Sequence, residues 1–140
     1  MTIIELITQA LRKANIIAQN ATPSAGQGAE CLAQLNIMFP MWEESDIFLQ
    51  WYTQTDTAAD YPGPDYSQQG VIGALAIAMA GNYGRRVPPE LSNPLGTGYA
   101  DVGMEVIRRK AQNRKLRPVD LTHLPSGSGW RQASNILTGE

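Results

Sequence analysis

The chain has few of the residues on which disulfide scaffolds, zinc sites and nucleophilic catalysis depend. Its 140 residues include one cysteine and one histidine. A lone cysteine forms no intramolecular disulfide or zinc site, and a nucleophile needs a base beside it. The start, Met1-Thr2-Ile3-Ile4-Glu5, lacks the basic region and cleavage site of a secretory signal. The longest apolar run, residues 71–80, is about half as long as a bilayer span. We therefore expect a protein that is made in the cytoplasm and has no membrane segment.

The length and composition are those of a chain that folds around one core. Apolar residues make up 43% of the sequence and charged residues 17%, which argues against wholesale disorder. The net charge of -2 is unevenly distributed. Residues 1–107 hold four basic and eleven acidic side chains, a net of -7, whereas residues 108–140 hold seven and two, a net of +5. The two ends are expected to face different partners.

The first half of the chain contains two segments with helical periodicity. Thr2 and Glu5 have the spacing of a capping box, which predicts a first amphipathic helix to about residue 17. A second helix, capped by Thr22 or Ser24, is expected to end near residues 45–46. Pro40 is expected to interrupt it and to produce a kink, because proline removes one backbone hydrogen bond and clashes with the carbonyl four residues back.

The second half contains two further helices. Residues 67–83 are apolar almost all round and rich in Gly and Ala, which predicts a buried central helix against which others pack closely. The last helix is expected at residues 99–113, with a basic end that suits the helix dipole. Its expected apolar face consists of Tyr99, Val102, Val106 and Ile107.

Residues 47–55 are rich in aromatic and β-branched side chains and predict an extended segment, one arm of a small β-hairpin. Trp51 and Tyr52 should then face opposite ways. Cys31 and Trp42 lie on the apolar stripe of the second helix and are expected in the core. With the core assigned in this way, no long exposed apolar helix face remains. We therefore expect the free protein to be largely monomeric and to assemble on a partner.

The last 25 residues differ from the rest. Proline and glycine in residues 116–140 exclude a long helix. The scattered apolar side chains are nevertheless unlike those of a flexible linker and suit contact with another surface. We predict an all-α domain of four main helices with a short extended element over residues 1–115, and an extended C-terminal arm over residues 116–140 that binds another surface.

The order of these segments resembles that of phage head-to-tail connector proteins. The second helix is similar in Leu32, Leu35-Asn36, Met38 and Trp42 followed by Asp46-Ile47. The central helix is similar in Pro64-Asp65-Tyr66, Ala74-Leu75-Ala76 and Asn82-Tyr83-Gly84. The last helix is similar in Pro89-Glu90 and Lys110-Ala111-Gln112-Asn113. The end, His123-Leu124-Pro125-Ser126-Gly127-Ser128-Gly129 with Asn135-Ile136-Leu137-Thr138-Gly139, resembles the tail of podovirus tail accessory factors, also called packaged DNA stabilisation proteins. Pro40 departs from the pattern.

The resemblance implies a structural virion protein at the head-tail interface. Such a subunit forms a dodecameric ring under the portal and docks its C-terminal arm on portal subunits. The ring extends the DNA channel, helps retain packaged DNA without sequence-specific binding, and connects to the next tail component, a nozzle, hub, fibre or spike. No cofactor, metal or membrane partner is implied, and the protein would be made in the host cytoplasm.

The expected portal contacts combine a basic run with the arm. Six of the eleven basic residues fall within ten positions, and the arm adds apolar side chains that are expected to act as anchors. Trp130 is the natural anchor among them, because aromatic residues bury much surface at little entropic cost. The expected set is Arg108, Arg109, Lys110, Arg114, Lys115, Arg117, Leu121, His123, Leu124, Trp130, Ile136 and Leu137. A solvated helix end, or contact with DNA phosphates, are the alternative interpretations of the basic run.

Two other functions stay open. Glu43, Glu44 and Asp46 could supply the paired carboxylates of a peptidoglycan hydrolase of the phage tail, although adjacent acids at a helix end are usually solvated. The basic run could instead belong to a phage DNA-binding packaging or regulatory protein, although no recognition helix is evident.

Overall fold

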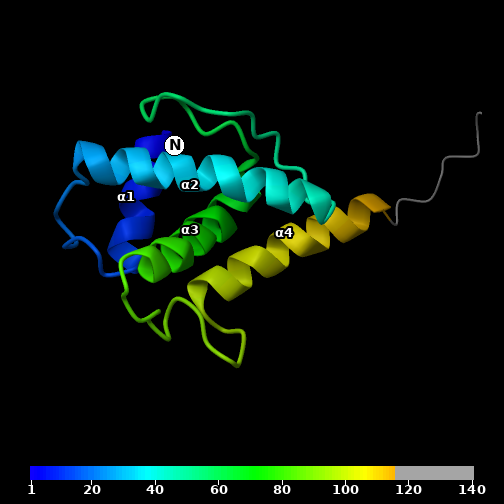
Figure 1. The fold of residues 1–140 in the computed structure, drawn as a ribbon. Coiled ribbons are helices and arrows are strands. Elements are labelled where there is room, and N and C mark those ends of the chain that lie inside the picture. The colour runs from blue at the N-terminus through cyan, green and yellow to red at the C-terminus, as the bar shows by residue number, and fades with distance from the viewer. Residues whose placement is uncertain (116–140) are drawn as a thin grey trace, which may run out of the picture.

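Four α-helices and one 3-10 turn make up the regular structure in the computed structural model, which describes residues 1–115 and the side chains of residues 1–113 (Figure 1). In chain order these are α1 (Ile3–Lys13), α2 (Ala25–Glu44), the 3-10 turn η1 (Asp65–Ser67), α3 (Gln68–Asn82) and α4 (Tyr99–Lys115). The all-α prediction is confirmed for these residues, which contain no β-strand. No helix in the described part is long and apolar enough to cross a membrane.

Local sequence determines where α1 and α2 begin. The Thr2 side chain accepts a hydrogen bond from the Glu5 N–H while the Glu5 carboxylate accepts one from the Thr2 N–H, which confirms the predicted capping box. Ser24 and Gln27 form the same reciprocal pair at the start of α2. The predicted end of the first helix near residue 17 is wrong. Asn15 has φ 57°, a left-handed conformation that Asn tolerates and that ends α1 four residues earlier than expected.

The interruption expected at Pro40 does not occur, because α2 continues through this residue to Glu44. Pro40 lies on the exposed side of the helix, where solvent can hydrate the backbone carbonyl that proline leaves without a donor. Leu35 and Phe39 are buried on the opposite side and hold both halves of the helix against the same core.

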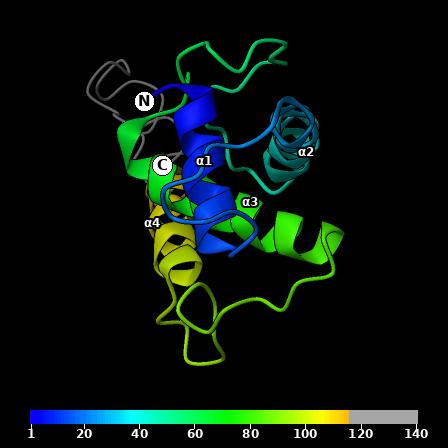
Figure 2. The same ribbon diagram turned by 90° about the vertical axis from the view of Figure 1, so that its left-hand side faces the viewer.

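α3 is the central helix, as predicted, and it packs against α1, α2 and α4 (Figures 1 and 2). Its closest approach is to α4. A Cβ atom added at Gly70 would lie 2.9 Å from the backbone carbonyl of Gly103, and one added at Gly73 would lie 2.5 Å from the Cα atom of Ala100. The two helices therefore cross with their backbones nearly in contact, which only very small residues allow.

This crossing corrects the face assigned to the last helix. Ala100, Gly103 and Ile107 are buried against α3, whereas Val102 and Val106 are 43% and 36% exposed. The close approach to Gly70 makes the Gly103 side of α4 the one that enters the core.

α4 begins where Asp101 holds the preceding loop. Its carboxylate accepts hydrogen bonds from the Asn93 N–H at 3.0 Å, the Ser92 hydroxyl at 2.9 Å and the Gly98 N–H at 3.3 Å. These bonds, the one from the Asn93 backbone first and that from Ser92 next, hold the pKa of Asp101 below its ordinary value. An acidic side chain in the first turn also suits the helix dipole.

The predicted β-hairpin is wrong, since residues 47–55 pair with no other strand in the described part of the chain. Their backbone is held by side chains and helix ends instead. The Asn36 amide donates to the Gln54 carbonyl at 2.9 Å, and its oxygen accepts from the Gln54 N–H at 3.0 Å and the Trp51 indole N–H at 3.1 Å. The expected opposite facing of Trp51 and Tyr52 is confirmed, because Trp51 is buried and Tyr52 exposed.

Trp51 joins this segment to α2 through its ring, which stacks on Phe39 with centroids 4.3 Å apart. Trp42 makes an edge-type contact with Phe39, with centroids 5.3 Å apart. Trp42 is half-buried and borders the core, so its expected place in the core interior is only partly correct.

Asn36→Ala should lower the free energy of unfolding by about 2 kcal/mol. The change leaves the Trp51 indole N–H and the Gln54 backbone groups without their partner, and an unsatisfied group costs about 1 to 3 kcal/mol. Urea denaturation followed by tryptophan fluorescence measures the change. Ala33→Ser, an exposed polar substitution on the same helix, is the control and should have little effect. Equal stability of the two variants would show that Asn36 does not hold the 47–55 segment.

Candidate interaction surfaces

Of the acidic residues considered for catalysis, Glu43 and Glu44 end α2 and Asp46 follows it, and all three are exposed. Glu43 and Glu44 are consecutive on the helix and therefore point about 100° apart, so they do not face one shared substrate position. In residues 1–115, no group of three or more His, Cys, Asp or Glu side chains is arranged to hold a metal ion.

Cys31 is a core residue, as predicted. Its side chain is fully buried in α2, and this burial raises the pKa of the thiol to about 12. The nearby Glu30 carboxylate acts in the same direction. A thiol with this pKa stays protonated at neutral pH, which favours packing over reactivity.

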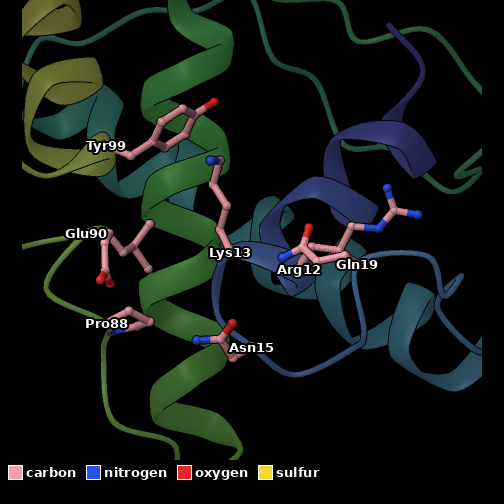
Figure 3. Close-up of a pocket in the computed structure, with 8 residues that line it drawn as sticks. Arg12, Lys13, Asn15, Gln19, Pro88, Glu90 and Tyr99 are labelled. Atoms are coloured by element: carbon pink, nitrogen blue, oxygen red, sulfur yellow. The ribbon is translucent and has the colours of Figure 1, made fainter.

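A small pocket of about 180 Å³ lies between the end of α1, the loop before α4 and the start of α4 (Figure 3). The Lys13 ammonium points at the Tyr99 ring, 3.7 Å from its centroid, while Arg12 turns away and donates to the Ala21 carbonyl at 2.9 Å. The volume is below that of typical ligand sites, which are roughly 300 to 1,000 Å³. No Ser, Thr, Cys or His lies among its lining residues, which are Arg12, Lys13, Asn15, Gln19, Pro88, Glu90, Leu91 and Tyr99. We interpret this feature as a contact that ties α1 to α4.

The basic run is continuous in sequence but not in space. Arg108 lines the hollows between the end of α2 and α4, and it contributes to the lowered pKa of Asp101. Arg109 forms an ion pair with Glu105, and Lys110 lies over the Tyr66 ring, 5.5 Å from its centroid. Successive helical positions point about 100° apart, so these three cations surround α4 and form no single patch.

The rest of the expected portal contacts lie beyond the described side chains. Arg114 and Lys115 belong to the last turn of α4, whose backbone alone is described. The arm, residues 116–140, lies outside the described residues together with its expected contacts, which are Arg117, Leu121, His123, Leu124, Trp130, Ile136 and Leu137.

α2 carries an exposed apolar stripe that the sequence did not predict. Ile37 and Met41 are 57% and 65% exposed and lie one turn apart, with Ala33 one turn before them. Glu30 and Glu44 border the stripe at its two ends. We call these five residues the α2 face. The sequence does contain a sign of this stripe, because α2 has apolar residues on both sides and contains no Lys or Arg.

A second exposed surface follows α4. Val102 and Val106 lie one turn apart, and Arg109 extends the same row by a further turn with 71% of its side chain exposed. We call these three residues the α4 face. Both exposed faces are short, each with two large apolar side chains, and neither was expected from the sequence.

The described part of the chain thus offers two exposed helix faces, the α2 face and the α4 face. No protein-family model and no curated protein matches the chain in sequence.

Proposed function

We propose that this chain is a head-to-tail adaptor of a short-tailed phage, a structural virion subunit that forms a ring under the portal. In this role it extends the DNA channel, helps retain packaged DNA and connects the portal to the next tail component. Its partners are the portal protein, other copies of itself and the tail component below the ring. The proposal includes no enzymatic activity, cofactor or sequence-specific contact with DNA.

The observation that carries the proposal is the basic C-terminal part of α4. The helix runs to the edge of the described domain (Figure 1), and its last two turns carry Arg108, Arg109, Lys110, Arg114 and Lys115 in the sequence. A basic helix end followed in the sequence by apolar anchors is suited to docking on an acidic protein surface. The small all-α domain and the resemblance in segment order and spacing support the same role.

Binding to the portal tests this proposal. Purified full-length protein mixed with the portal of the same phage should sediment with it, and its affinity should fall as salt rises, because exposed charges are screened. Two assays on the isolated protein separate the alternatives. Release of fragments from purified peptidoglycan would favour the hydrolase, and steeply salt-dependent binding to duplex DNA would favour the packaging or regulatory protein. Either result without portal binding would overturn the adaptor proposal.

A further inference from the structure

The α2 face belongs to an acidic stretch of the sequence. Residues 14–84 contain seven acidic side chains and no Lys or Arg, and two of those acids, Glu30 and Glu44, border the exposed pair Ile37 and Met41. An apolar surface with an acidic border is complementary to an apolar surface with a basic border.

The α4 face has that complementary character within the same chain. Val102 and Val106 supply the apolar part, and Arg109 follows them toward the basic end of the helix. The Arg109 side chain pairs with Glu105 across an exposed helix surface. Such an ion pair contributes about 0.3 to 0.5 kcal/mol, so Arg109 can exchange it for a carboxylate of a partner at little cost.

The exposed apolar residues of the two faces lie apart from the region where α2 and α4 approach each other. The two helices do not pack directly against each other, and each packs against α3. The end of α2 and α4 line shared hollows, but Ile37, Met41, Val102 and Val106 are not among the lining residues. Figure 2 shows α2 and α4 on either side of α1. One copy can therefore offer its α2 face to one neighbour and its α4 face to another at the same time.

We propose that the α2 face of one copy binds the α4 face of the next, in a head-to-tail contact between identical chains. Such a heterologous contact uses different surfaces on the two partners, and it generates a ring when the rotation between copies closes. The inference deepens the proposed function and rests on it for the ring, but the pairwise contact can be tested on the protein alone.

Three exposed apolar residues provide matched variants. Ile37→Glu places a charge in the α2 face, Val106→Glu places one in the α4 face, and Leu95→Glu, at a loop residue that is 86% exposed and belongs to neither face, is the control. Circular dichroism should show that all three fold, because each side chain is at least partly in solvent.

Sedimentation velocity of the full-length chain up to about 1 mM measures self-association, a range that covers contacts of about -4 kcal/mol. The parent and Leu95→Glu should associate with rising concentration, and less at about 0.5 M than at about 0.05 M salt. Ile37→Glu and Val106→Glu should each weaken the association at least tenfold. A mixture of these two variants should form a 1:1 dimer and nothing larger, because one intact α2 face meets one intact α4 face.

Several outcomes overturn the inference. A parent that stays monomeric over the whole range shows that the contact is absent. Loss of association in Ile37→Glu but not in Val106→Glu shows that something other than the α4 face covers α2, such as a second α2 face. Association that appears only in a chain ending at Lys115 shows that residues 116–140 cover the α2 face themselves. Portal binding by the same variants is scored separately: if the parent self-associates as described but never binds the portal, the adaptor proposal fails and this contact stands.

Discussion

Gly103→Ala should destabilise the domain by about 3 kcal/mol or more, although it adds a single methyl group. The new Cβ atom would lie 2.5 Å from the Gly70 backbone nitrogen and 2.7 Å from the Gln69 carbonyl carbon. Both are main-chain atoms of α3, so no side-chain rotation relieves the clash and the two helices must move apart. Overpacking costs about 1 to 3 kcal/mol where side chains can adjust, and more where they cannot. Urea denaturation of the parent protein and of Gly103→Ala measures the difference in their free energies of unfolding.

Gly81→Ala is the matched control within the same helix pair. Gly81 lies in α3 with nothing within 4 Å of its added Cβ atom, so the same chemical change should raise the free energy of unfolding by about 0.5 to 1 kcal/mol through backbone entropy. Opposite signs at Gly103 and Gly81 are expected. A Gly103→Ala protein as stable as the parent would mean that α3 and α4 do not cross at these residues.

A chain that ends at Lys115 should keep its helical domain and lose at least about 100-fold in affinity for the portal, or about 2.7 kcal/mol. Every core residue in the described part of the chain lies at or before Ala111, so the thermal transition should resemble that of the full chain. In the full chain, Trp130→Ala should reproduce part of the loss, because aromatic anchors often dominate interface energetics.

The charge contribution to docking can be separated from that of the arm. Replacing Arg114, Lys115 and Arg117 with Gln should weaken portal binding more at low salt than at high salt, where screening already reduces the attraction. A truncated chain that binds the portal as tightly as the full chain would show that residues 116–140 are not the docking element.

The parts of the fold that the sequence predicts are those with local causes. The Thr2–Glu5 box starts α1 because the two groups that satisfy each other are three residues apart. The central position of α3 follows from its apolar, Gly- and Ala-rich composition. The β-hairpin predicted for residues 47–55 was wrong because Asn36, distant in sequence, provides the hydrogen bonds that a partner strand would have made. The predicted end of α1 was wrong because the helix ends at the left-handed backbone conformation of Asn15, which periodicity does not reveal.

The candidate surfaces were less predictable than the fold. Arg108, Arg109 and Lys110 are neighbours in sequence, but helical geometry separates them, and each has a partner on its own chain or lies near one. The α2 face could be identified only from the packing, which shows which of the two apolar sides of the helix enters the core. The α4 face depended on the crossing at Gly103, a contact between segments about 30 residues apart that periodicity alone does not reveal.

The most direct measurement of the central claim is a cryo-EM reconstruction of the full-length protein mixed with the portal of the same phage. The account predicts a dodecameric ring of this chain at the exit of the portal, with residues 116–140 in contact with portal subunits and the channel continuing through the ring. A portal reconstruction without added density at its exit, at protein concentrations in the range of about 1 mM, would contradict it.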